Sequence, residues 1–225
     1  LLGIMLCIAS NLQQLGITNG DSVGKAGFIT SVYIMLVPVV GLFFKKKTHP
    51  LIWLCAVVSA VGLYFLSVDP ARGAFNIEFS DLAYLGCAVF FAVQIILVSI
   101  YSPQVNCIAL SCIQFAVAAV FSGIGMLFFE TPSFAAILNA AGPLLYAGIL
   151  SCGIAYTLQV IGQRGIDPAI ASLIMCLESV FSVIAGFLLL NQRMTPREIL
   201  GCGIMFAATV AAQLIPSTQK KNSRN

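Results

Sequence analysis

Eight apolar runs, each close to the length of a membrane-crossing helix, constrain the fold of this chain more than any other feature. A helix needs about 20 apolar residues to cross the ~30 Å hydrocarbon core of a bilayer. Strands of a transmembrane barrel would be about 10 residues long with alternating polarity, and neither feature occurs here. The sequence therefore predicts an all-α integral membrane protein, a multi-span helical bundle. The runs cover residues 1–18, 26–44, 51–67, 81–101, 105–129, 142–162, 168–190 and 197–215.

The shortage of charge supports the same fold class. Only 8% of the residues are charged and 60% are hydrophobic, whereas about 25% of the residues of a soluble domain are charged. A net charge of +3 is too small to predict a nucleic-acid partner. The eight cysteines lie singly in apolar runs and the one histidine, His49, lies in a loop, so we expect no disulfide framework and no metal site.

No cofactor is expected from these residues. The expected partners are a small-molecule solute and the lipid bilayer, and homodimer formation is left open.

The distribution of basic residues predicts the orientation of the chain in the membrane. Alternate loops lie on opposite sides of the membrane, and one side carries seven Lys and Arg residues, in 45–47, at Arg164 and in the C-terminal tail, against four on the other. Lys and Arg are enriched on the cytoplasmic side. We therefore predict a multi-pass protein of the plasma membrane with a cytoplasmic C-terminus.

Part of the first span recurs 146 residues later in the sixth. The first and sixth spans cross the membrane in opposite directions, and such an inverted repeat is typical of secondary transporters. Pro50 and Pro196 keep the same offset. The matching residues are Ala9, Leu12, Gln13, Gly16 and Asp21 in the first copy, and Ala155, Leu158, Gln159, Gly162 and Asp167 in the second.

The span at 168–190 carries the most informative polar residue of the chain, Glu178. An acid near the middle of a span costs about 2.5 kcal/mol on insertion scales, and such residues are functional by default. The small and polar face around Glu178 predicts a cavity wall, and the apolar face opposite predicts a lipid contact. A Glu that only hydrogen-bonds a neighbouring helix is the alternative. The first face contains Ala171, Met175, Ser182 and Ala185, and the second contains Leu173, Val180, Ile184 and Phe187.

Other polar side chains within the spans are candidates for the substrate cavity or for coupling. Amides in hydrocarbon also serve as contacts between helices, at about 0.6 kcal/mol per hydrogen bond, so this alternative stays open for each of them. Pro38 cannot donate a hydrogen bond to the carbonyl of Ile34, and it predicts a helix kink. The candidate site residues are Glu178, Tyr156, Gln159, Asn11, Gln14, Tyr33, Gln94 and Ser182.

Motifs of several other function classes are absent from the sequence. It contains no GxxxxGK[ST] phosphate loop of an ATP-driven pump and no HExxH or GxSxG motif of a hydrolase. A membrane-embedded enzyme of lipid metabolism would need clustered His, Asp or Cys near one interface, and the sequence offers a lone Glu instead. We therefore expect a transporter and not an enzyme.

Two stretches resemble the EamA family of the drug/metabolite transporter (DMT) superfamily. They are LQQLGITNGDSVGKAGFITSVYIMLVP at 12–38 and LQVIGQRGIDPAIASLIMCLESVFSVIAGFLLLNQ at 158–192. In the second, Ala171-Ser172 and Leu177-Glu178-Ser179-Val180 resemble the start and core of the penultimate helix of that family. Ser179 replaces a usual Pro, and Gln192 stands where a Glu often follows.

The resemblance implies two inverted five-helix repeats around a central cavity, with both termini cytoplasmic. On this basis residues 1–67 are a truncated first repeat of three helices, 76–215 are the complete second repeat, and 216–225 are a polar cytoplasmic tail. Eight spans of ten would then be present, with two more expected before Leu1. The implied function is a secondary transporter, a permease or exporter of small organic metabolites or drugs that works by alternating access, with proton coupling left open. A permease for nucleotide sugars or phosphorylated metabolites is the alternative.

Overall fold

The computed structural model describes residues 1–19, 23–46, 48–67, 79–130, 133–190 and 194–222. Within these ranges the regular elements are all helical. They are α1 (Leu2–Asn19), α2 (Val23–Thr30), α3 (Tyr33–Phe43), α4 (Pro50–Ser67), α5 (Phe79–Tyr101), α6 (Cys107–Phe129), α7 (Phe134–Asn139), α8 (Ala141–Leu145), η2 (Tyr146–Tyr156), α9 (Thr157–Gln163), α10 (Pro168–Leu190) and α11 (Pro196–Asn222).

Seven helical stretches in the described part of the chain are long and apolar enough to cross a membrane. The predicted fold class, an all-α multi-span membrane protein, is therefore confirmed. The first expected span forms the helix α1 but is not among the seven. Five of its last nine residues are amides or carry a hydroxyl group, which lowers its hydropathy: Asn11, Gln13, Gln14, Thr18 and Asn19.

The second span is interrupted, although not at the expected residue. Its two helices, α2 and α3, are separated by Ser31 and Val32. Around this break the amide groups of Ile34 and Met35 donate to carbonyls three residues earlier, at 3.1 and 2.9 Å, which is 3₁₀ geometry. Pro38 is buried inside α3, and a kink at Pro38 stays a prediction.

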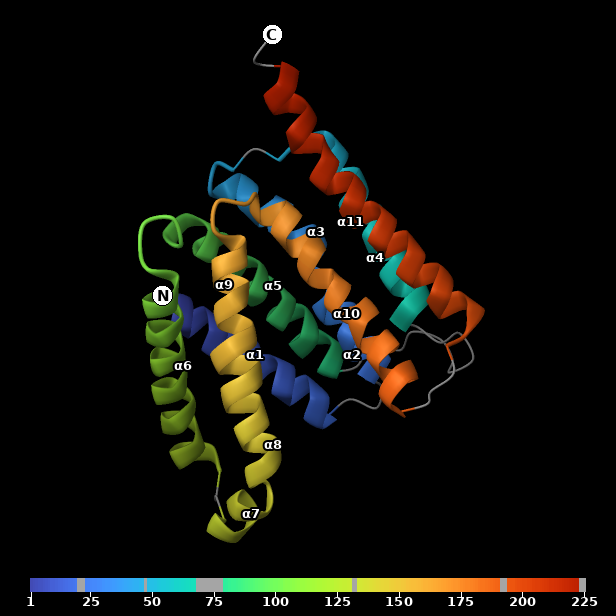
Figure 1. The fold of residues 1–225 in the computed structure, drawn as a ribbon. Helices are drawn as coiled ribbons and strands as arrows, with labels where there is room; N and C mark the ends of the chain where they lie inside the picture. The colour runs from blue at the N-terminus through green and yellow to red at the C-terminus, as the bar shows by residue number, and fades with distance from the viewer. Residues whose placement is uncertain (20–22, 47, 68–78, 131–132, 191–193, 223–225) are drawn as a thin grey trace.

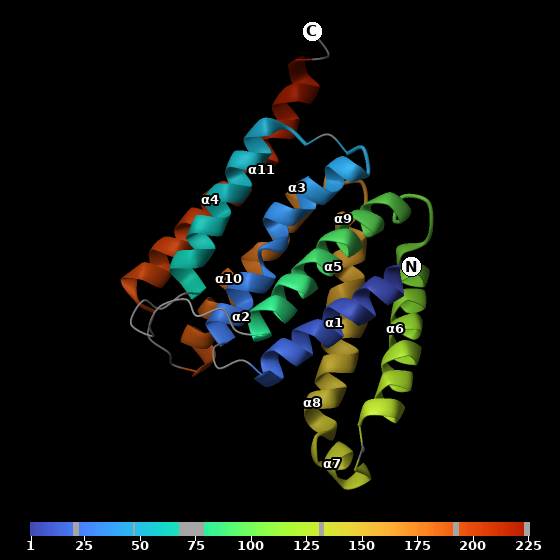
Figure 2. The same ribbon diagram turned by 180° about the vertical axis from the view of Figure 1, so that it is seen from behind.

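The helices pack in a fixed order across the bundle. α3 and α10 lie between the α4–α11 pair and the α1–α5 pair, and α6 lies beside α1 at the opposite edge of the bundle (Figures 1 and 2). α9 crosses α5 and contacts α6. The C-terminal ends of α3, α9 and α11 all lie toward the upper end of Figure 1. The segments that follow these three helices therefore lie on the same side of the bundle, as the alternation of spans in the sequence predicts.

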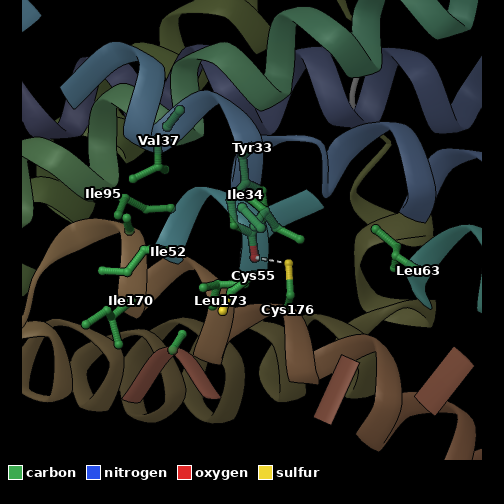
Figure 3. Packing of buried hydrophobic residues seen from close by; sticks show 14 of the residues in the cluster. Tyr33, Ile34, Val37, Ile52, Cys55, Leu63, Ile95, Ile170, Leu173 and Cys176 are labelled. Atoms are coloured by element: carbon green, nitrogen blue, oxygen red, sulfur yellow. Dashed lines mark hydrogen bonds between the residues drawn. The ribbon is translucent and has the colours of Figure 1, made fainter. Parts of the chain in front are cut away.

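A cluster of buried apolar residues joins α3, α4, α5, α10 and α11 (Figure 3). Leu173 and Val180 of α10 belong to this core, so the prediction that they face lipid was wrong. Lipid tails are as apolar as leucine, so an apolar position in a span can face either lipid or protein. Ile184 and Phe187 are exposed on the bundle surface, as a lipid contact requires.

The last helix extends beyond the expected end of its span. α11 continues through Pro216 to Asn222, into the segment that was expected to be a polar tail from residue 216. The segment contains Gln219, Lys220 and Lys221, which have good helix propensity. The apolar span itself ends at Leu214.

Candidate functional site

Glu178 is within electrostatic reach of residues from two other spans. It is the one charged residue of the span Pro168–Leu189, and its side chain is exposed. Its carboxylate interacts electrostatically with the hydroxyl groups of Tyr33 and Tyr156, which come from α3 and η2. An accessible acid at mid-span, with a tyrosine from each of two other helices nearby, suits contact with water or a solute better than tight helix packing.

Tyr33 is held in place by a contact with α10. The thiol of Cys176 donates to the hydroxyl oxygen of Tyr33 at 3.7 Å (Figure 3). Both residues are buried, and Cys176 lies two positions before Glu178. This hydrogen bond therefore ties α3 to α10 beside the acid.

Tyr156 lies at the end of η2 and makes an aromatic contact with α6. Its ring meets the ring of Phe115 edge to face, with centroids 5.7 Å apart and an interplanar angle of 82°. Such pairs contribute about 0.5–1.5 kcal/mol beyond the area that they bury. We call Tyr33, Phe115, Tyr156 and Glu178, from four helical segments, the Glu178 site.

Phe115 could not be recognised as part of this site from the sequence. The chain contains 16 phenylalanines, and a Phe in an apolar span has no local signal that separates a cavity wall from a lipid contact. Gln159 lies half-buried on α9, one turn after Tyr156. Ser182 is exposed on α10, one turn after Glu178. Both are therefore close in sequence to residues of the Glu178 site.

Two expected site residues lie on α1, away from α10. Asn11 donates through Nδ2 to the Cys7 carbonyl at 2.8 Å and to Ser122 Oγ of α6 at 3.3 Å. This second hydrogen bond links α1 to α6. Gln14 is exposed near the end of α1. The contacts of Asn11 favour the helix–helix alternative that the sequence left open.

Gln94 of α5 is fully buried and contacts one residue of α6. Its Nε2 donates to Oε1 of Gln114 at 3.5 Å. Gln94 Oε1 and Gln114 Nε2 have no hydrogen-bond partner in the described structure. A buried polar group without a partner costs about 1–3 kcal/mol. Loss of either side chain would therefore leave the other without its hydrogen bond. This contact also favours a role between helices over contact with a solute.

Metal ligation has no support among the described residues, where no group of three or more His, Cys, Asp or Glu side chains could hold an ion. All eight cysteines are free thiols. Four of them are buried, as expected for small apolar side chains: Cys55, Cys87, Cys107 and Cys176.

The chain is similar to known proteins in sequence and in fold. The model of the EamA-like transporter family matches residues 78–212. A curated protein of Archaeoglobus fulgidus, named an uncharacterized transporter, is 28% identical over 215 residues, which cover 95% of this chain and 67% of that protein. A crystal structure of another protein aligns with a TM-score of 0.77 at 19% identity, covering 95% of this chain and 75% of the other. This last likeness concerns the fold alone.

Proposed function

The chain belongs to the EamA-like transporter family, and from this premise we propose that it is a secondary transporter that moves a small organic solute across the cell membrane by alternating access. The observation that carries the proposal is the position of Glu178. An accessible acid at mid-span, within electrostatic reach of Tyr33 and Tyr156, provides a polar site at the depth where such transporters bind their solutes.

The arrangement of the helices supports an inverted repeat. α4 begins at Pro50 and α11 at Pro196, which is the offset of the sequence repeat. The same offset relates α3 to the second half of α10. These related helices pack against each other in pairs, α4 with α11 and α3 with α10. In our proposal the two repeats rock against each other along these paired helices.

The break between α2 and α3 falls at the position of the first repeat that corresponds to Glu178 in the second. The repeat offset pairs Val32 with Glu178. The break is followed directly by Tyr33, a residue of the Glu178 site. Because a stretch of 3₁₀ geometry within a helix often marks a hinge, we propose that Ser31 and Val32 bend as the site changes sides.

The charge of the described spans favours a neutral or cationic solute over a phosphorylated one. Arg197 is the one basic residue among the seven spans. It lies at the start of α11, where its guanidinium group stacks over the rings of Tyr64 and Phe65, 5.2 and 5.4 Å from their centroids. A phosphate near Glu178 would face an acidic side chain, and the one basic residue of these spans lies at the start of another helix. We therefore disfavour the alternative of a nucleotide-sugar permease.

Counterflow in lipid vesicles tests alternating access. Vesicles that contain the protein are loaded with one unlabelled compound from a panel of amino acids, amines and sugars, and uptake of the same compound in labelled form is measured. A carrier should take up its solute several-fold faster when the solute is also inside, because the loaded site returns faster than the empty one. An uptake rate that is the same with and without internal solute would indicate a channel. Uptake of no compound would remove the support for transport of these classes.

Orientation is tested by cysteine labelling from outside the cell. In a variant without native cysteines, we expect Met194→Cys to react with a membrane-impermeant maleimide and Thr48→Cys to react only after the cells are permeabilised. The reason is the excess of Lys and Arg on the side that carries residue 48 and the C-terminus. The reverse labelling pattern would place the C-terminus outside.

A further inference from the structure

Buried polar atoms without a hydrogen-bond partner gather in one part of the bundle. In the described structure eight buried side-chain nitrogen and oxygen atoms have no partner, and five of these belong to α5, α6, α9 or the residue that follows α5. Their side chains are at most 3% exposed. Polar residues that hold helices together are hydrogen-bonded to one another, so helix contact does not account for these atoms. They are Gln94 Oε1, Ser102 Oγ, Ser111 Oγ, Gln114 Nε2 and Gln163 Oε1.

The five atoms lie at two levels, on either side of a small apolar cluster. On α5, Gln94, Val98 and Ser102 follow one another at intervals of four residues and so share one face. On α9, Gln163 lies one turn after Val160. Val98 and Val160 belong to the same cluster, and α5 and α9 both end toward the upper end of Figure 1. Ser102 and Gln163 therefore lie beyond the cluster at one end of the bundle. We call this cluster the apolar layer: Leu2, Leu97, Val98, Cys107 and Val160.

The other level lies on the opposite side of the apolar layer, next to the Glu178 site. Ser111 and Gln114 share a face of α6 with Cys107, which is part of the layer. Gln114 accepts the hydrogen bond from Gln94 at 3.5 Å. The next residue, Phe115, belongs to the Glu178 site. The apolar layer therefore separates the polar residues beside that site from those at the end of the bundle.

We infer that the apolar layer is the gate of a closed water path, which leads from the Glu178 site to the end of the bundle at which α5 and α9 end. Apolar constrictions act as gates because they exclude water. When the layer parts, water can pair with the polar atoms on both sides of it, and this accounts for their lack of partners while it is closed. The end beyond the layer is the one predicted to be cytoplasmic. A role for the path in releasing the Glu178 proton to cytoplasmic water rests on the proposed function.

A hydroxyl group placed within the apolar layer tests this inference. Val98→Ser and Val160→Ser should each admit water to the layer. Val37→Ser is the matched control, because Val37 is also fully buried but lies in the other core cluster, on a helix that carries none of the eight unpartnered atoms. Vesicles that contain each variant and a pH-sensitive dye receive an external pH step in the presence of potassium and valinomycin. The rate at which the internal pH follows measures the passive proton leak.

We expect Val98→Ser and Val160→Ser to raise the leak about ten-fold above that of wild-type vesicles, because a polar group in an apolar constriction favours its hydration. Val37→Ser should keep the wild-type leak. A wild-type leak in both layer variants, or an equal rise in Val37→Ser, would overturn the inference. If the serine variants do not fold, Val160→Thr, which keeps the shape of valine, is judged by the same criteria against Val37→Thr. The assay contains no solute, so failure of the proposed function would be seen separately in the counterflow measurement.

Discussion

Gly201→Ala is expected to destabilise the bundle strongly, whereas Gly203→Ala, two residues further along the same helix, is expected to be harmless. A Cβ atom at residue 201 would lie 2.6 Å from the carbonyl oxygen of Gly62 and 2.9 Å from the backbone nitrogen of Leu66. Backbone atoms cannot rotate away as a side chain can, so α4 and α11 would have to separate. Overpacking of this kind costs about 1–3 kcal/mol.

The contact is important because α4 and α11 form the most extensive helix pair in the described structure. In lipid, helices associate through van der Waals packing, and small residues allow the backbones to approach. The approach is reciprocal, since a Cβ atom at Gly62 would lie 2.9 Å from the carbonyl oxygen of Gly201. Gly62→Ala should therefore have the same effect, and both variants should disturb the pairing that we propose relates the two repeats.

Unfolding in mixed micelles, followed by circular dichroism as the fraction of sodium dodecyl sulfate rises, measures this effect. Gly203→Ala is the matched control, because nothing lies within 4 Å of a Cβ atom there and alanine favours the helix by about 1 kcal/mol. Gly201→Ala should unfold at a lower detergent fraction than the wild type, and Gly203→Ala at the same or a higher one. Equal midpoints for the two variants would contradict the close approach of α4 and α11.

The helical spans could be predicted from the sequence because length and hydropathy determine what can cross a bilayer. The expected span 168–190 coincides with α10, and the expected span 197–215 begins one residue after the start of α11. Glu178 could also be identified from the sequence, because a charged residue within an apolar span is unusual on any face of the helix. In each case the signal lies in the local sequence.

The surroundings of Glu178 could not be predicted in the same way. Lipid and protein interior are both apolar, so periodicity did not identify Leu173 and Val180 as core residues, nor Phe115 as a neighbour of Tyr156. The 3₁₀ break at Ser31–Val32 and the π-helix η2 are differences of hydrogen-bond register. Their residues have no propensity signal comparable to that of Pro38, and Pro38 lies inside a continuous helix.

Replacement of Glu178 by Gln should abolish coupling between solute and proton movement while the protein still folds. Gln keeps the shape and hydrogen-bonding capacity of Glu but cannot release a proton. We propose that the Glu178 carboxyl alternates between protonated and ionised forms as the site changes sides, as acids do in other transporters. Solute-driven proton flux should then fall to the level of vesicles without the protein, because Gln carries no proton that can be released.

The measurement uses vesicles that contain the protein and a pH-sensitive dye, with addition of each compound that shows counterflow in the wild type. Glu198→Gln is the matched control. The Glu198 side chain accepts hydrogen bonds from the amide and hydroxyl groups of Thr195 at 2.6 and 2.9 Å, at the start of α11. This is a capping box that Gln also satisfies. Glu198→Gln should therefore retain wild-type proton flux.

Counterflow in Glu178→Gln separates a coupling role from a structural one. If Glu178 only couples, solute exchange should survive in the variant and lose its dependence on pH, because exchange returns the loaded site without any need to deprotonate. If Glu178 instead binds the solute directly, exchange should fail together with proton flux, although the unfolding midpoint stays at the wild-type value. Wild-type proton flux and wild-type pH dependence in the variant would eliminate both roles and leave Glu178 as a hydrogen-bonding contact between helices.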